Sequence, residues 1–141
     1  MADLTHDDPI GSILQRPAVT VHPDDSLRSV ASVLSQESIG LAVVRGASPS
    51  DHRGEKAIGV LSERDIVQAV ADGLDAERTS AAEVMTVDFA SARPDEALAV
   101  VARRMLDNEI RHLLVIDGEG LVTGVVSARD LLQSLTDEVA P

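Results

Sequence analysis

The sequence predicts a mixed α/β fold built from two tandem copies of one strand-helix-strand-strand-helix unit. The first observation is a repeated heptapeptide: GVLSERD, Gly59–Asp65, returns 65 residues later as GVVSARD, Gly124–Asp130. The second is a longer match, in which Val19–Val44 aligns with Ala90–Val115 at an offset of 71 residues. Self-similarity of this kind is the signature of a duplicated structural unit. We therefore expect both halves of the chain to fold alike.

The first half of each copy predicts a strand and a helix. A short extended piece, Val19–Val21 or Ala90–Ala92, is followed by Pro and Asp, which favour a helix start. Apolar residues then recur at helical spacing: Leu27, Val30, Ala31 and Leu34 in the first copy, and Leu98, Val101, Ala102 and Met105 in the second. Each helix can therefore bury one apolar stripe.

The second half of each copy predicts two strands and another helix. The apolar runs Leu41–Val44 and Leu113–Ile116 are short and rich in branched residues, which is typical of strands. The next strand ends in the repeated heptapeptide, where a serine, Ser62 or Ser127, begins the last helix. Gly73 is placed to end the first of these helices as a C-cap.

The copies also predict how the chain is divided. The offset falls from 71 to 65 because the first copy has six extra residues in an exposed loop, Arg45–Lys56. We expect a flexible N-terminus (1–9), a first repeat (10–72), a linker (73–81), a second repeat (82–135) and a C-terminal tail (136–141). A three-stranded sheet with two helices is too small to bury both its faces, so the repeats are expected to share a core.

Composition excludes several classes of function. The formal net charge of −12 and the pI near 4.5 argue against a nucleic-acid polymer or an anionic membrane as partner. The absence of cysteine excludes disulfides and thiolate metal sites, and four scattered histidines predict no metal centre. The start MADLTHDDP lacks signal-peptide features and no apolar run is long enough to span a membrane, so we expect a cytoplasmic protein.

The repeated heptapeptide has two interpretations. A serine followed three residues later by an acid can form a capping box, which stabilises a helix start. The same helix start offers free N–H groups and the positive end of the helix dipole, which suit a phosphate. The serine hydroxyls of Ser62 and Ser127 can add a hydrogen bond there, and Asp65 and Asp130 can accept hydrogen bonds from ribose hydroxyls. Capping and ligand binding are compatible.

The paired heptapeptides, EVMT before the second copy and IRHLLVID within it resemble the tandem CBS (cystathionine beta-synthase) domain pair, or Bateman module. The resemblance covers the chain from Ile10 to Leu135. It implies two β-α-β-β-α repeats packed with pseudo-two-fold symmetry, with clefts that take adenosine-containing ligands. It also assigns Ser62 and Ser127 to phosphate and Asp65 and Asp130 to ribose.

Further candidate ligand contacts follow from the resemblance. The basic pair Arg111 and His112 is expected to face phosphates, and the first copy has Gly40 and Leu41 there, so the two sites should differ. For His112, a packed structural role is the alternative. Candidate polar contacts also include Thr20, Ser91, Arg64 and Arg129. The adenine is expected among Val19, Ile39, Val60, Ile110 and Val125, which are otherwise core residues.

We therefore expect a regulatory module that binds AMP, ADP or ATP, with or without Mg²⁺, and signals occupancy to an unidentified partner protein. S-adenosylmethionine and NAD are second choices, and no cofactor is required. The resemblance also implies a homodimer formed through helical faces. The alternative is a ligand-free module for dimerisation or protein interaction. An enzyme is not expected, because the sequence holds no Walker, Rossmann or HExxH motif and no supported nucleophile.

Overall fold

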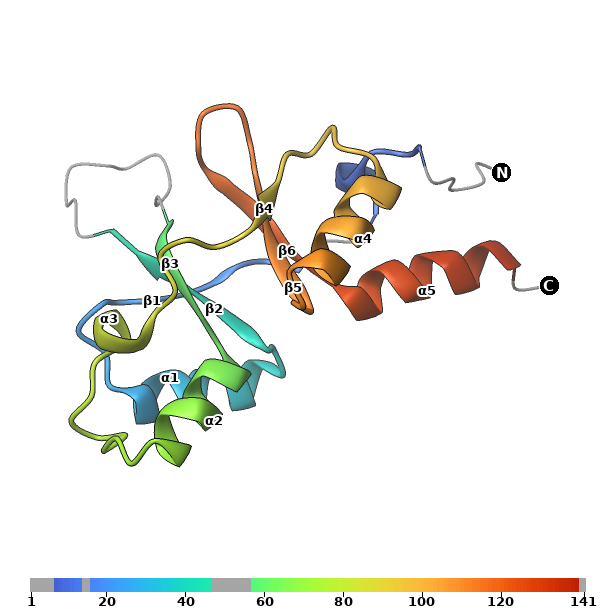
Figure 1. Cartoon of the computed structure of the whole chain (residues 1–141). Coiled ribbons are helices and arrows are strands. Elements are labelled where there is room, and N and C mark those ends of the chain that lie inside the picture. The colour runs from blue at the N-terminus through green and yellow to red at the C-terminus, as the bar shows by residue number, and fades with distance from the viewer. Residues whose placement is uncertain (1–6, 14–15, 47–56, 140–141) are drawn as a thin grey trace. The chain divides into compact units, whose positions relative to one another are not determined.

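The computed structural model describes residues 7–13, 16–46 and 57–139, with side chains described to residue 134. Its contacts divide the chain into two compact units. The first-copy unit is Ala18–Phe89, and the second-copy unit combines Met1–Pro17 with Ala90–Pro141. Each unit is mixed α/β, as the sequence predicts, and Figure 1 follows the chain through both. No helix in the described part of the chain is long and apolar enough to cross a membrane.

The first-copy unit holds a three-stranded sheet in the order β1-β2-β3. Strand β1 is parallel to β2, and β2 is antiparallel to β3. Its elements are β1 (Val19–Val21), α1 (Leu27–Glu37), β2 (Leu41–Arg45), β3 (Ala57–Ser62), α2 (Glu63–Ala71) and α3 (Ala81–Val84). Most of the predicted loop Arg45–Lys56 lies outside the described residues.

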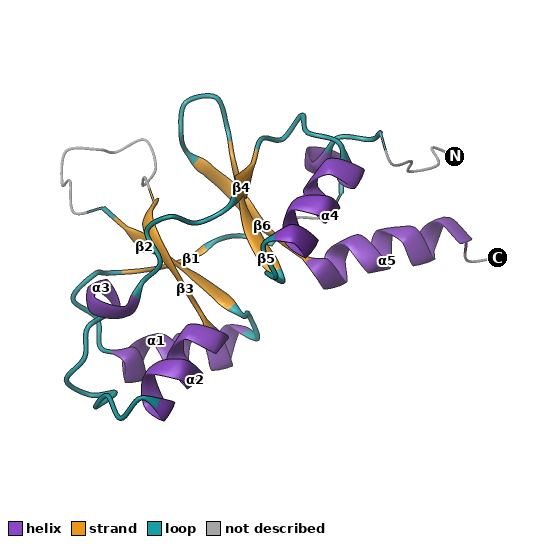
Figure 2. Cartoon of the chain, in the orientation of Figure 1, coloured by secondary structure: helices purple, strands orange, loops and turns teal. Residues whose placement is uncertain are grey.

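The second-copy unit repeats this arrangement with the sheet order β4-β5-β6. Strand β4 is parallel to β5, and β5 is antiparallel to β6. Its elements are η1 (Ile10–Ser12), β4 (Ser91–Ala92), α4 (Leu98–Asp107), β5 (His112–Ile116), β6 (Val122–Ser127) and α5 (Ala128–Val139). The predicted strand-helix-strand-strand-helix order is confirmed in both copies, and in each unit the two long helices lie on one side of the sheet (Figure 2).

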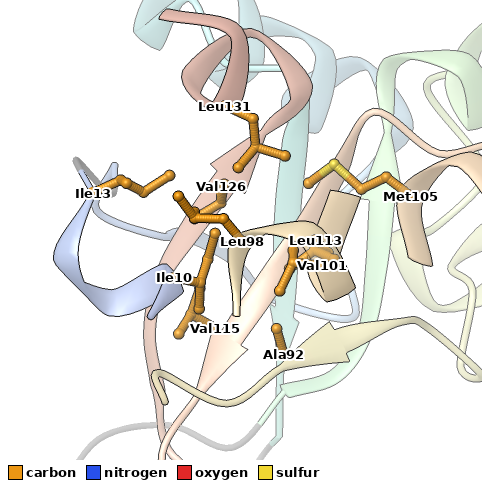
Figure 3. Close-up of a cluster of buried hydrophobic side chains, with 10 residues drawn as sticks. All are labelled: Ile10, Ile13, Ala92, Leu98, Val101, Met105, Leu113, Val115, Val126 and Leu131. Atoms are coloured by element: carbon orange, nitrogen blue, oxygen red, sulfur yellow. The ribbon is translucent and has the colours of Figure 1, made fainter. Parts of the chain in front are cut away.

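Each unit has its own hydrophobic core between sheet and helices. The predicted helical stripes supply Leu27, Val30 and Leu34 to one core and Leu98, Val101 and Met105 to the other. Figure 3 shows the second-copy core, in which the side chains gather from η1, α4, α5 and the sheet. Burial of aliphatic side chains, at about 1.5–3 kcal/mol each, is the main stabilising term for both units.

A segment from outside each repeat completes each unit. In the second-copy unit the Ile10 N–H donates to the Glu96 carbonyl at 2.7 Å, and the Ile10 side chain is fully buried. Figure 1 accordingly shows η1, in blue, beside α4, in orange. In the first-copy unit the Ala81 N–H donates to the Asp25 carbonyl at 2.7 Å, and Ala81 is also fully buried.

The compact units and the predicted repeats therefore divide the chain differently. The chain passes from one unit to the other after Pro17 and again after Phe89, because the segment that precedes the first copy packs with the second copy. The linker that precedes the second copy packs with the first in the same manner. The repeat boundaries 10–72 and 82–135 stay a prediction about sequence duplication, whereas the units follow contacts in space.

Candidate functional site

Both repeated heptapeptides form complete capping boxes at the start of their helices. At α2, the Asp65 N–H donates to Ser62 Oγ at 3.1 Å, and the Ser62 N–H donates to Asp65 Oδ2 at 2.9 Å. At α5, the corresponding bonds join Ser127 and Asp130 at 3.0 and 2.9 Å. The capping interpretation of these residues is therefore confirmed. Each serine hydroxyl still has its proton to donate, and each aspartate still has Oδ1 to accept.

The strand that precedes each heptapeptide strand delivers residues to the same place. His112 pairs with Ser127 across β5 and β6, and the Ala128 N–H donates to the Arg111 carbonyl at 2.8 Å. In the first copy, Leu41 pairs with Ser62. The predicted basic pair Arg111 and His112 is thus brought to the start of α5, with Arg111 exposed and His112 half-buried.

Strand register sorts the remaining candidates onto two faces of each sheet. Thr20, Val43 and Val60 lie in one row across the first-copy sheet, and Ser62 shares their face because alternate strand residues point the same way. Ser91, Leu114 and Val125 form the matching row, with Ser127 on the same face. The structure therefore brings the predicted hydroxyl residues of the first strands onto the same sheet faces as the capping serines.

The five residues predicted to surround the adenine take different positions in the two units. Val19 stands in the row with Ala42 and Leu61, which belong to the first-copy core. Ile39 and Ile110 are half-buried and pack against the two cores. Val60 and Val125 are buried on the faces that carry the capping serines.

Gly59 has a structural reason within the first-copy unit. A Cβ at this position would lie 2.6 Å from Met85 Sδ and 3.1 Å from the Thr86 carbonyl oxygen. The missing side chain makes room for the chain after α3 rather than for a ligand. The glycine, serine and aspartate of the first heptapeptide are thus each explained by local packing or capping.

Asp130 differs from its counterpart in burial and in partners. Its side chain is 3% exposed, whereas Asp65 is half-buried. Within the described part of the chain, Asp130 Oδ1 is buried and has no hydrogen-bond partner. The nearest cationic atom is Arg16 Nε at 3.6 Å, which is longer than a hydrogen bond. A buried acceptor in this state is costly, and a donor group from a ligand would relieve that cost.

Sequence reasoning did not identify Arg16 as a site residue. Arg16 reaches the second heptapeptide because its N–H and carbonyl pair with Val125 at 3.1 and 2.9 Å. Thr86 makes the same pair of bonds with Val60 in the first copy, at 2.8 and 2.9 Å. One signal in the sequence could have identified Arg16: the segment Ile13–Pro17 precedes the first copy as the linker precedes the second.

The two helix starts therefore carry opposite charge. Around the start of α2, the carboxylates of Glu63 and Asp65 stand against one guanidinium, that of Arg64. Around the start of α5, there is one carboxylate, that of Asp130, and there are three guanidiniums, those of Arg16, Arg111 and Arg129. Arg64, Arg111 and Arg129 are exposed.

A second ionic cluster supports the second-copy unit. Arg104 donates two hydrogen bonds to the Glu96 carboxylate, at 2.6 and 2.9 Å, and one to the Ser91 carbonyl at 2.8 Å. The hydrogen bonds from Arg104 hold the pKa of Glu96 at about 2, well below its usual value of 4.5. This pair ties α4 to the strand that holds the candidate residue Ser91. Within residues 7–13, 16–46 and 57–134, no group of three or more acidic or histidine side chains is placed to bind a metal ion.

The duplicated strand-helix-strand-strand-helix fold, with a capped helix start in each copy, defines a tandem-repeat module. The family model described as "CBS domain" matches this chain twice, at residues 10–72 and 81–137. The chain therefore belongs to the CBS domain family and holds a tandem pair.

Relatives and solved structures agree with this assignment. The CBS domain-containing protein YhcV of Bacillus subtilis is 32% identical over 79% of this chain and 74% of its own. The CBS domain protein PAE2072 from Pyrobaculum aerophilum, solved in complex with AMP, has 30% identity and a TM-score of 0.75 over 91% of this chain and 98% of its own. The CBS domain pair of protein MJ0100, in complex with 5′-methylthioadenosine and S-adenosyl-L-methionine, has 25% identity and a TM-score of 0.79, covering 92% and 97%. Some curated relatives are longer, and the chain spans 61% of one of them.

Proposed function

We propose that this chain is a regulatory CBS pair, without catalytic activity of its own, that binds an adenosine-containing ligand at its strand-to-helix junctions. A partner protein would respond to the occupied state. The observation that carries the proposal is the buried, unpartnered Oδ1 of Asp130 beside the capped start of α5. An oxygen of this kind accepts a hydroxyl hydrogen bond, and the vicinal hydroxyls of ribose supply such donors.

The surrounding groups suit the rest of a nucleotide. The hydroxyl of Ser127 accepts the Asp130 N–H and keeps its own proton for a phosphate oxygen. The helix dipole of α5 favours an anion at the same end. Ser91 and Val125 lie on the same sheet face, where they can contact the base. Solved relatives that hold AMP, or 5′-methylthioadenosine with S-adenosylmethionine, support this ligand class.

The matching residues of the first copy form the second proposed site. Ser62, Asp65, Thr20 and Val60 stand in the same relation to each other as their counterparts. ADP and ATP extend the same ligand class, and Mg²⁺ would arrive with ATP rather than in a protein cage. S-adenosylmethionine and NAD share the adenosine moiety and belong in the same screen.

The test is a thermal-unfolding panel with AMP, ADP, ATP, S-adenosylmethionine, 5′-methylthioadenosine and NAD. A ligand at 100 times its dissociation constant adds about 2.7 kcal/mol of stability, which is an easily measured rise in melting temperature. Asp130→Asn keeps an oxygen for the capping box but replaces the free acceptor, so the rise due to binding at α5 should disappear. Asp95→Asn, at an exposed position of the same unit, is the matched control. No rise with any ligand would contradict the proposal.

Exposed apolar side chains favour a second function, dimerisation through helical faces. Val67 and Val70 on α2 are 68% and 56% exposed, and Leu106 on α4 is 68% exposed. Burying such residues against a second copy would be favourable, since each branched side chain is worth about 1.5–3 kcal/mol. Light scattering of the wild-type chain and of Val67→Asp/Val70→Asp tests this. A dimer that the double substitution leaves intact would place the interface elsewhere.

A further inference from the structure

The two helix starts differ most at one equivalent position, which Arg16 occupies in the second-copy unit and Thr86 in the first. Both residues are held by paired backbone hydrogen bonds to a strand residue two positions before the capping serine. This fixed backbone places Arg16 Nε 3.6 Å from the buried carboxylate of Asp130. The Arg16 side chain is 44% exposed, so the guanidinium is at the surface of the site rather than sealed in it.

Arg16 has unused hydrogen-bonding capacity. A guanidinium has five N–H donors. Within the described residues, the Arg16 guanidinium contacts only Asp130 Oδ1, at a distance of 3.6 Å that is too long for a hydrogen bond. Oδ1 therefore stays available for a ligand hydroxyl, and the guanidinium stays available for a ligand anion. The two groups together match a molecule that carries a hydroxyl donor and a negative charge close to each other.

We propose that Arg16 makes the site at the start of α5 selective for anionic adenosine ligands, such as nucleoside phosphates, over neutral or cationic ones. The site at the start of α2 lacks this selectivity, because Thr86 replaces the arginine and the flanking acids Glu63 and Asp65 repel a phosphate. The inference rests on the proposed function and assigns a ligand class to each of its two sites.

The selectivity would come from a charge-assisted hydrogen bond between the Arg16 guanidinium and a ligand phosphate, at a position partly shielded from solvent. A guanidinium binds a phosphate oxygen more strongly than a neutral donor does, and its planar N–H groups can hold two oxygens. A neutral thioether analogue such as 5′-methylthioadenosine leaves that guanidinium without its anion. The sulfonium of S-adenosylmethionine meets an unfavourable field at α5 and a favourable one at α2.

The experiment is an NMR titration of the isotope-labelled full chain with AMP, 5′-methylthioadenosine and S-adenosylmethionine. Backbone amides of Ser127 and Asp130 report the site at α5, and those of Ser62 and Asp65 report the site at α2. At α5 we expect AMP to bind about tenfold more tightly than 5′-methylthioadenosine, as loss of one hydrogen bond to a charged group implies. At α2 we expect AMP to bind no more tightly than the neutral ligand.

Substitutions decide the role of Arg16. Arg16→Gln should abolish the preference for AMP at α5 and leave the affinity for 5′-methylthioadenosine within about twofold, because the lost interaction is with the charge alone. Arg103→Gln removes the same charge from an exposed position of the same unit and should preserve the preference. Thr86→Arg should create a preference for AMP at α2, and this gain does not depend on the stability of the Arg16 variant.

The outcomes separate the two proposals. An AMP preference that survives Arg16→Gln, or a Thr86→Arg chain that gains none, overturns the role of Arg16 while the proposed function stands. If no adenosine ligand shifts the amides of either site, the proposed function fails, and the role of Arg16 fails with it. Loss of the preference in Arg16→Gln together with its gain in Thr86→Arg supports both.

Discussion

The first-copy and second-copy units use the same backbone plan but treat charge differently. The second-copy unit pairs Glu96 with Arg104 inside the structure and places Arg16 beside a buried carboxylate. Where Arg104 stands, the aligned residue of the first copy is Val33. At the start of α2, the first-copy unit has an exposed acid, Glu63, and a half-buried one, Asp65.

This difference suggests how one duplicated fold can serve two purposes. The capping boxes and apolar stripes are shared because both units need the same helix starts and the same cores. Charged residues differ between the copies, as Arg104 and Val33 show at one pair of equivalent positions and Arg16 and Thr86 at another. We therefore expect stability and ligand choice to depend on charged residues in the second copy more than in the first, and substitutions at these positions test this.

The largest effect is expected from Ile10, whose counterpart in the first copy is Ala81. Ile10 is fully buried in the second-copy core although it precedes the first copy in sequence. Ile10→Ala should lower the free energy of unfolding by about 2–4 kcal/mol, through lost burial and the cavity left behind. Urea unfolding measures this, and Ile58→Ala, at a position 39% exposed, is the control. A cost equal to that of the control would mean that the N-terminal segment is not part of this core.

The next effect concerns the ion pair that only the second copy has among the described residues. The pKa of Glu96 is about 2 in the folded chain and near 4.5 when unfolded, so the pair stabilises the fold above pH 4.5. This contribution, at most about 3 kcal/mol for a pair about one quarter exposed, is lost as the pH falls from 4.5 towards 2.

Glu96→Gln should therefore be less stable than wild type at pH 7, and the gap should shrink below pH 4.5. Denaturant unfolding at several pH values measures the gap. Glu119→Gln removes the same charge from an exposed turn and should cost less than about 0.5 kcal/mol at every pH. A gap for Glu96→Gln that does not depend on pH would show that packing, rather than charge, is responsible.

Local features were predictable from the sequence, and contacts between distant segments were not. Ser62, Ser127 and Gly73 act within a few residues of their own positions, so the sequence predicts these two helix starts correctly and the end of α2 to within one residue. The C-cap is Asp72, and Gly73 follows it with a φ of 87°. The burial of Ile10 and the placement of Arg16 depend on pairing with residues far along the chain. A repeat alignment shows which segments are equivalent, but not which copy each segment packs against.

The candidate site divides in the same way. The hydroxyl and acid pairs were predicted, together with their alternative as capping boxes, because both interpretations rest on the same spacing of three residues between serine and aspartate. The predicted surroundings of the adenine include Val19 and Val60, which lie on opposite faces of the first-copy sheet, since strand register was not known. Val19 shows this: it is next to Thr20 in sequence but stands in the row of Ala42, which faces the core.

A smaller effect is expected at Gly59, where an added side chain would meet the segment that follows α3. Gly59→Ala places a methyl group within 2.6 Å of Met85 Sδ, and the overpacking should cost about 1–3 kcal/mol. Because the crowded atoms belong to one flexible side chain, Met85→Ala in the same chain should recover part of the loss. A double-mutant cycle measures this coupling. Additive costs would show that the backbone of Thr86, rather than Met85, excludes a side chain.

The smallest effect separates the two roles of the repeated serines. The capping bonds of Ser62 and Ser127 have nearly equal lengths, 3.1 and 3.0 Å, so Ser62→Ala and Ser127→Ala should each cost about 1 kcal/mol without ligand. With AMP present, the costs should diverge, because in the proposed complex the Ser127 hydroxyl would also donate to a phosphate beside Arg16, whereas Ser62 is next to the acids of α2. Melting temperatures with and without AMP measure both quantities. If the two substitutions cost the same with and without AMP, the serines act only as helix caps. The two sites would then differ only in the charges around α5.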